Sequence, residues 1–269
     1  MWMKEIFGTD KPIVAMLHLA ALPGDPLYDE NKGLCYVIER AKREIKALQD
    51  GGVDGILISN EYSFPYMGDV PIITAMSMAR VIGQLKEYFT IPMGVQIISD
   101  PYKTFDLAAS VGAKFVRGTF TGSFAGDHGI AVYDTGKIMR HKIAVGAMDV
   151  KCMYNLVPEA AKYLVDRSWE EIADSTVFHC KPDALMVAGF LAGREADTQI
   201  MTRVKKVVPN TPVFANTGVR YENIEMQLAA CDGAIVGTTF KEDGDFYKEA
   251  KYDRVKAFMN KVREFRGDK

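Results

Sequence analysis

Several apolar runs in this chain end in a side chain that could do chemistry. Glu61 follows the run GILIS, a position that suits a general base, although the alternative is a solvated loop carboxylate. Arg117 ends the run FVR, and its guanidinium could bind a phosphate or a carboxylate through two parallel hydrogen bonds. The alternative for Arg117 is an internal ion pair with Glu61 or Asp149.

A second group of candidates follows the run GAM. Asp149 could move a proton. Lys151 could act as a base or a Schiff-base amine, or it could neutralise a substrate phosphate. We favour neutralisation, because lysines with a depressed pKa are the rarer case. Further polar side chains expected in the same ring are His18, Asn60, Gln96, Asp100 and Asn216.

Four of these residues are of types that bind hard divalent ions, namely His18, Glu61, Asp100 and Asp149. If they converge, a divalent metal ion is the one cofactor that the sequence suggests. A lone histidine after a strand is more often a packing or hydrogen-bonding residue than a ligand. His141 and His179 lie in helical or helix-ending segments, and we expect them to be structural.

The stretch from Thr211 to Lys241 contains two glycine turns, each after an apolar run. It predicts a strand (212–215), a turn (216–218), a helix (221–230), a strand (233–236) and a second turn (237–239). In a (β/α)8 barrel, the loops after strands seven and eight form the common phosphate site. The binding groups expected here are Asn216, Thr217, Gly218, Val219, Gly237, Thr238 and Thr239. The alternative is two ordinary turns of an α/β protein.

The elements that would position these residues alternate along the chain. Strands are expected at 13–19, 55–59, 93–98, 115–118, 143–149, 184–188, 212–215 and 233–236. Helical patterns fall at 34–49, 73–88, 105–111, 134–141, 169–176, 197–207, 221–230 and 253–265. Eight such pairs predict an α/β fold, a single (β/α)8 TIM barrel over residues 1–269, with catalytic side chains at the C-terminal ends of the strands.

The turns between these elements support the same fold. Helices end in small-residue turns such as 51–55, 111–114 and 231–233, where glycine is the usual left-handed cap. Two loops after strands are long, at 20–31 and 119–133. Glycines 122, 126 and 129 favour a mobile lid for the second loop, and the alternative is a loop without function.

Bulk properties limit the kind of partner. The 269 residues carry a net charge of −2 with acids and bases interspersed, which argues against nucleic acid. The four scattered cysteines fit reduced thiols, and neither a signal peptide nor a membrane-length apolar run is present, so we expect a cytoplasmic protein without membrane insertion. Trp2, Phe64, Tyr66 and Met67 lie in segments expected to be exposed and favour a homo-oligomer, although scattered apolar residues are also normal on a monomer.

Several motifs occur together in order and at consistent spacing. They are GTDKPIVAMLHLAALPGDP, GGVDGILISNEYSFPY, FTGSFAGDHG, PDALMVAG and ANTGVRYENIEMQLAACDGAIVGTTFK. Across essentially its whole length the chain resembles the BtpA family, and within it the SgcQ branch. The resemblance implies a ribulose-phosphate-binding type of barrel. The family is named for a role in photosystem I biogenesis, whereas the SgcQ branch resembles parts of sugar-phosphate catabolism.

The resemblance also implies a set of site residues. The family pattern falls on His18, Pro23, Gly24, Asn60, Glu61, Arg117, Asp127, Lys151, Gly189, Asn216, Gly218 and Lys241. Gln96 stands where the wider family often has asparagine, and Asp149 stands where an acidic residue is expected. A free choice between aspartate and glutamate there argues against strict metal geometry.

Together these observations favour an enzyme acting on a small phosphorylated sugar or a related phosphorylated metabolite. Isomerisation, epimerisation, aldol cleavage and hydrolysis require the same kinds of site residues, so all four reactions stay open. The alternatives are a non-enzymatic assembly or stability factor that uses the barrel as a scaffold, and a nucleotide-binding or nucleotide-hydrolysing protein. The last ranks lower because no GxxxxGK[ST] segment is present.

Overall fold

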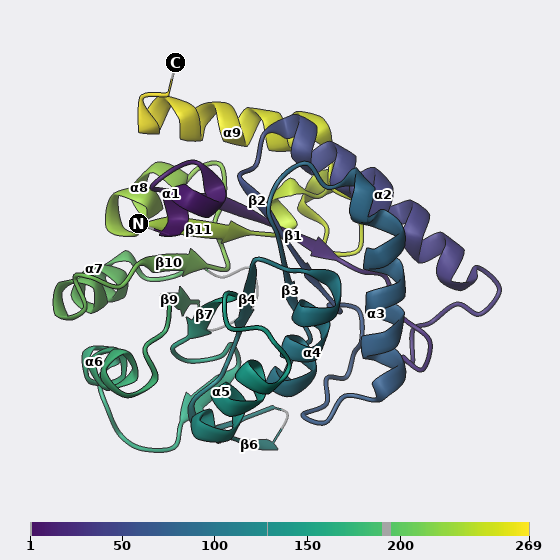
Figure 1. Cartoon of the computed structure of the whole chain (residues 1–269). Helices are drawn as coiled ribbons and strands as arrows, with labels where there is room; N and C mark the ends of the chain where they lie inside the picture. The colour runs from purple at the N-terminus through teal and green to yellow at the C-terminus, as the bar shows by residue number, and fades with distance from the viewer. Residues whose placement is uncertain (1, 128, 190–194, 269) are drawn as a thin grey trace.

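The computed structural model describes residues 2–127, 129–189 and 195–268. Eight parallel strands form a closed barrel with helices around its outside (Figure 1). In order around the ring, the strands are β1 (Ile13–His18), β2 (Gly55–Ser59), β3 (Met93–Gln96), β4 (Phe115–Gly118), β7 (Lys151–Asn155), β9 (Ala184–Ala188), β10 (Val213–Asn216) and β11 (Gly233–Val236). β11 pairs back onto β1, so the ring closes and the predicted barrel is confirmed.

The helices of the outer ring follow the strands in turn. They are α2 (Gly33–Gly51), α3 (Ile72–Leu85), α4 (Pro101–Val111), α5 (Thr135–Ala144), α6 (Trp169–Cys180), α7 (Thr198–Val207), α8 (Ile224–Ala230) and α9 (Tyr252–Arg266). In the part of the chain that the structure describes, the short 3-10 helices are η1 (Lys86–Tyr88), η2 (Thr238–Phe240) and η3 (Glu242–Gly244). Local signals fix several ends: Ser168 and Glu171 form a capping box at α6, and α2 ends at Gly52 in the left-handed conformation.

Side chains alternate between two cores along each strand. On β1, Val14 and Met16 belong to the core inside the barrel, while Ile13 and Leu17 pack outwards against the helices. His18 is the next inward position, so it ends in the mouth of the barrel. The same alternation directs the following residues inwards at the ends of the other strands: Ser59, Gln96, Arg117, Asn155, Ala188, Asn216 and Gly237.

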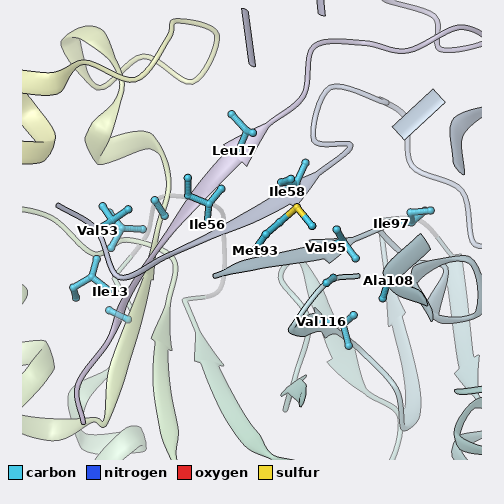
Figure 2. Packing of buried hydrophobic residues seen from close by; sticks show 14 of the residues in the cluster. Ile13, Leu17, Val53, Ile56, Ile58, Met93, Val95, Ile97, Ala108 and Val116 are labelled. Carbon is cyan, nitrogen blue, oxygen red and sulfur yellow. The ribbon is translucent and has the colours of Figure 1, made fainter. Parts of the chain in front are cut away.

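The outer core is shown in Figure 2. Ile56, Val95 and Val116 come from the neighbouring strands β2, β3 and β4, and Ala108 of α4 lies beside them. Inside the barrel, the Phe115 ring takes the space that a side chain at residue 94 would need. A Cβ on Gly94 would lie 2.3 Å from that ring, so glycine is required there. The interior is therefore filled with side chains below the mouth.

The fifth barrel strand differs from the expectation. Residues 143–149 are not a strand: Ile143 and Ala144 end α5, and Gly146 has a φ of +77° in the turn that follows. The strand is β7, which begins at Lys151. The apolar run IAVGAM resembles a buried strand in composition, but the glycine turn within it ends a helix.

A small antiparallel sheet lies outside the barrel ring. It consists of β5 (Gly122–Gly126), β6 (Gly129–Tyr133) and β8 (Ala161–Tyr163), in the order β6-β5-β8. The long loop after β4, expected as a lid, is therefore a regular hairpin, and its third strand comes from the segment after β7. We call this three-stranded sheet the roof.

The N-terminal helix α1 (Trp2–Phe7) packs at the end of the barrel opposite the mouth. Met3 and Phe7 join the core inside the barrel, and the Trp2 indole donates to the Asp183 carbonyl at 3.0 Å. Of the four apolar residues expected to be exposed, Met67 is 51% exposed, while Trp2, Phe64 and Tyr66 are only partly exposed. Within the described residues, no helix has both the length and the apolar character needed to cross a membrane.

Candidate functional site

The mouth of the barrel holds two adjoining cavities, with volumes of about 560 Å³ and about 320 Å³. The larger cavity, which we call the phosphate lobe, is lined by the loops after β10 and β11. The smaller one, which we call the roof lobe, lies against the roof and the loops after β3 and β4. Both are lined by Glu61, Arg117, Glu159 and Asn216. These four polar side chains therefore stand between the lobes.

Arg117 is the central cation of this site and is only 8% exposed. Its Nε donates to Gln96 Oε1 at 2.7 Å, and its Nη1 donates to Asn216 Oδ1 at 3.1 Å. Asn216 in turn donates to Asn155 Oδ1 at 3.2 Å. Arg117 forms no salt bridge with any described carboxylate, in contrast to the ion pair weighed from the sequence. Neutral amides orient the guanidinium, and its charge stays available to an anionic ligand.

The loops after β10 and β11 lie side by side, as expected. The Thr239 hydroxyl donates to the Val219 carbonyl at 2.5 Å, which joins the two loops. Thr217 and Gly218 have φ values of +73° and +63°, so the first loop turns sharply directly after Asn216. Further residues of these loops that line the phosphate lobe are Arg220, Gly237 and Thr238, and Arg254 of α9 lines it too. Together with Arg117, the lobe therefore combines glycines, hydroxyls and three arginines.

Two carboxylates face the shared centre of the mouth. Glu61 accepts a hydrogen bond from Ser59 Oγ at 2.7 Å. The pKa of Glu159 is raised to about 7, because burial outweighs the opposing positive charge of Arg117 and the nearby charge of Glu61 acts in the same direction as burial. A carboxyl group with a pKa near 7 can hold or release a proton at neutral pH.

His18 lies beneath the second phosphate-lobe loop. A Cβ on Gly237 would lie 3.3 Å from His18 Nε2, so the glycine lets this loop approach the ring. Burial lowers the pKa of His18 well below its usual value, and the positive charges of Lys241, Arg117 and Arg40 lower it further. His18 Nδ1 is buried without a hydrogen-bond partner among the described residues. The imidazole is therefore neutral.

Lys241 lies behind His18 and is 1% exposed. Its Nζ donates to the Tyr62 hydroxyl at 2.7 Å and to the Phe246 carbonyl at 2.9 Å. Burial lowers its pKa to about 8. Arg40 also donates to the Tyr62 hydroxyl and pairs with Glu44, so this cluster joins α2 to the loops around the mouth. These contacts indicate that the role of Lys241 is structural.

Asp149 and Lys151 do not reach the mouth, in contrast to the sequence expectation. Lys151 is the first residue of β7, and its Nζ pairs with Asp183 at 3.2 Å at the N-terminal end of the barrel. Asp149 is exposed in the turn before that strand. Since Asp149 is at the opposite end from His18 and Glu61, the four residues weighed as metal ligands do not converge. No group of three or more metal-binding side chains occurs among the described residues.

The other expected site residues have mixed positions. Asp100 borders the roof lobe, but it caps α4 by accepting from Lys103 N at 3.0 Å, and it also pairs with Lys103 Nζ. Asp127 borders the same lobe in the turn between β5 and β6. Gly189 follows β9, and its N–H donates to Thr217 Oγ1 at 3.0 Å. Gly189 therefore supports the phosphate lobe from behind.

Glu159 and Asn155 are site residues that the sequence does not predict, because the fifth strand predicted from it begins too early in the chain. A signal for the correct placement is present. The string Val-Gly-Ala ends a helix at 111–113, directly before β4, and the same string recurs at 145–147. Reading the second string as the same turn would start the strand near residue 150 and end it at Asn155, with Glu159 in the loop beyond.

Comparison with known proteins places the chain in a family. The model of the BtpA family matches residues 9–264. The chain is 48% identical to the putative sgc region protein SgcQ of Escherichia coli strain K12, over 98% of this chain and 99% of that protein. It is 27% identical to the photosystem I biogenesis protein BtpA of Synechocystis, over 97% of this chain and 91% of that protein.

Among solved structures, the chain is similar to N-(5'-phosphoribosyl)anthranilate isomerase from Pyrococcus furiosus. The TM-score is 0.56 with 12% sequence identity, over 94% of this chain and 99% of the isomerase. At this identity, the likeness concerns the barrel fold alone.

Proposed function

This chain belongs to the BtpA family, and from that premise we propose that it is an enzyme of the isomerase or epimerase type acting on a small phosphorylated sugar. The observation that carries the proposal is the pair Glu61 and Glu159, which lines the same cavity as a glycine- and threonine-rich double loop and a buried arginine. Such a site joins an anion-binding surface to groups that can move a proton.

The phosphate of the substrate binds in the phosphate lobe. Gly218 and Gly237 leave space for close approach, Thr217 and Thr238 supply hydroxyl groups, and Arg220 supplies charge. A structural neighbour of the same fold is named as an isomerase of a phosphoribosyl compound, although the two proteins share only their fold. The phosphate thus fixes one end of the sugar.

Proton transfer takes place at the centre of the mouth. Glu61 removes a proton from a carbon next to a carbonyl group, and Glu159 supplies one, because its pKa near 7 leaves much of it protonated at neutral pH. The charge that develops on the carbonyl oxygen is stabilised by Arg117, which Gln96 and Asn216 hold in place. The neutral imidazole of His18 can donate a hydrogen bond to the same oxygen, and it is a weaker acid than a protonated imidazolium would be.

The residues that line the two lobes favour proton transfer over aldol cleavage through a Schiff base. No lysine is among the described residues that line either cavity. Lys151 lies at the opposite end of the barrel, and Lys241 is held behind His18 by Tyr62 and Phe246. An amine nucleophile at the reacting carbon is therefore missing from the described part of the mouth.

The test has two stages. A thermal-shift screen with pentose and hexose phosphates, their unphosphorylated sugars and inorganic phosphate identifies a binding sugar phosphate. That compound is then incubated with the protein in D2O, and deuterium incorporation next to the carbonyl is followed by NMR. We expect exchange with the wild type and at least about 100-fold slower exchange with Glu61→Gln, at unchanged ligand affinity. Wild-type exchange in Glu61→Gln would remove Glu61 from the mechanism.

A protein without any stabilising ligand in this screen would contradict the proposal and favour a scaffold role. A scaffold should also tolerate joint neutralisation of Glu61, Glu159 and Arg117. Ligand stabilisation is easily measured, because a ligand at about 100 times its Kd adds roughly 2.7 kcal/mol to the free energy of unfolding.

A further inference from the structure

The roof lobe is a second compartment that a small sugar phosphate would not need. The phosphate lobe alone, at about 560 Å³, is already within the size range of sites that enclose a whole small ligand. The roof lobe adds about 320 Å³ on the other side of Glu61, Arg117, Glu159 and Asn216. A substrate that fills both lobes must extend beyond the reacting sugar.

The walls of the roof lobe are largely apolar and partly aromatic. Its lining includes Ile97, Pro101, Phe120, Phe124, Tyr133 and Pro158. The Phe124 ring lies edge-on to Tyr163 at 4.9 Å between ring centroids, so the roof side is supported by a second aromatic residue. Apolar walls with a few placed polar groups are typical of pockets that bind flat organic groups.

Two polar residues at the edge of this lobe are engaged in hydrogen bonds within the protein. The Asp100 carboxylate accepts hydrogen bonds from Val70 N, Lys103 N and Lys103 Nζ. The Thr104 hydroxyl accepts from Ile97 N and donates to backbone carbonyls of the same loop. Because Asp100 and Thr104 already have partners, they offer little polar surface to a ligand, and the further polar residues of this edge are Ser99, Thr119 and Asp127.

The roof itself has two distinct faces. Along β6, Ala131 and Tyr133 line the roof lobe, whereas Ile130 and Val132 point outwards and are 73% and 72% exposed. This is the period-2 alternation of a strand. Gly126 lets the roof sit close to the segment after β7, since a Cβ there would lie 2.4 Å from the Ala160 carbonyl. The inner face is thus packed directly above Glu159.

We propose that the roof lobe binds a flat, mainly apolar ring attached to the phosphorylated sugar. This proposal rests on the proposed function and narrows its substrate class from plain sugar phosphates to sugar phosphates that carry a ring substituent. The phosphate binds in one lobe, the sugar lies between Glu61, Glu159 and Arg117, and the ring lies beneath the roof. The carbon that bears the substituent is then next to the two carboxylates.

Binding measurements with four probes test this arrangement. They are inorganic phosphate, ribose 5-phosphate, adenosine 5'-monophosphate and uridine 5'-monophosphate, each titrated into the protein by calorimetry. We expect at least one of the two ring-bearing compounds to bind at least about tenfold more tightly than ribose 5-phosphate, because the ring buries apolar surface. A fifth compound, unphosphorylated adenosine, serves as a control and should bind more weakly than its monophosphate.

Two matched variants locate the ring. Ala131→Phe fills the roof lobe from β6, while Val132→Phe adds the same side chain one residue later on the exposed face. We expect Ala131→Phe to reduce the affinity for the ring-bearing compound to that for ribose 5-phosphate and to leave ribose 5-phosphate binding unchanged. Val132→Phe should leave both affinities unchanged.

The outcomes separate the two proposals. If ribose 5-phosphate binds and neither ring-bearing compound binds more tightly, the ring site is wrong and the phosphate lobe stands. An affinity gain that survives in Ala131→Phe also overturns the ring site, because the ring would then lie elsewhere. If none of the phosphorylated probes binds to the folded protein, the ring site is wrong, and the proposed function fails with it when the screen of pentose and hexose phosphates also yields no ligand.

Discussion

The two lobes of the mouth are built in different ways. The phosphate lobe is formed by short loops that continue directly from β10 and β11 and are joined by the bond from Thr239 to Val219. The roof lobe is covered by strands that come from two separate parts of the chain, 122–133 and 161–163. The first is an integral part of the barrel, whereas the second is an addition to it. In the function proposed above, the first lobe anchors a phosphate and the second is a separate compartment for the variable part of the substrate.

The largest effect is expected when the proton donor between the two lobes is replaced. We expect Glu159→Gln to reduce turnover by at least about 100-fold while phosphate binding persists. In the wild type, activity should fall as the pH rises through about 7, because the raised pKa keeps Glu159 protonated below that value and it must donate a proton. The measurement is the pH profile of kcat/KM. A profile with no inflection near pH 7 would exclude Glu159 as the donor.

A change confined to the phosphate lobe should affect binding and leave the roof lobe intact. Gly218→Asp places a negative charge beside the bound phosphate, and we expect at least about a tenfold loss of affinity for inorganic phosphate and ribose 5-phosphate. Gly218→Asn is the matched control. Both side chains must adopt the same φ of +63°, so the two variants share any backbone strain and differ in charge. Equal affinities in both would show that charge at this loop is irrelevant.

The smallest effects are expected at the opposite end of the barrel. Asp149→Asn and Lys151→Met should leave kcat and KM unchanged, since neither residue lines the mouth. Lys151→Met removes a partly exposed ion pair with Asp183, and such pairs contribute about 0–1 kcal/mol to stability. Steady-state kinetics with thermal unfolding of each variant checks this. A large loss of kcat in a stably folded Lys151→Met variant would contradict the assignment of Lys151 to the lower end.

The same division explains what the sequence could predict. Seven of the eight expected barrel strands overlap strands of the structure, because buried parallel strands and left-handed glycine turns are local signals. His18, Gln96, Arg117 and Asn216 were placed in the mouth for that reason. Their hydrogen-bonded network could not be predicted, since it depends on how strands distant in the sequence pack around the ring.

The failures have two physical causes. Residues 143–149 have the composition of a strand, but a helix end and a glycine turn take up that run, and the error moved Asp149 and Lys151 to the wrong end of the barrel. The roof could not be foreseen because β8 joins a hairpin almost thirty residues earlier, and pairing of that kind leaves no periodic signal in either segment. Glu159 was missed for both reasons.

Closure of the ring has a consequence for how the chain is made. β1 pairs with β11, and Arg266 of α9 binds the Lys11 carbonyl and Asp54 next to β1 and β2. α9 also packs along α2 (Figure 1). During synthesis from the N-terminus, one edge of β1 stays unpaired until β11 has been made, and one side of α2 stays uncovered until α9 has been made. The barrel therefore closes only after β11 has left the ribosome, and the early strands are the segments that a chaperone would have to protect.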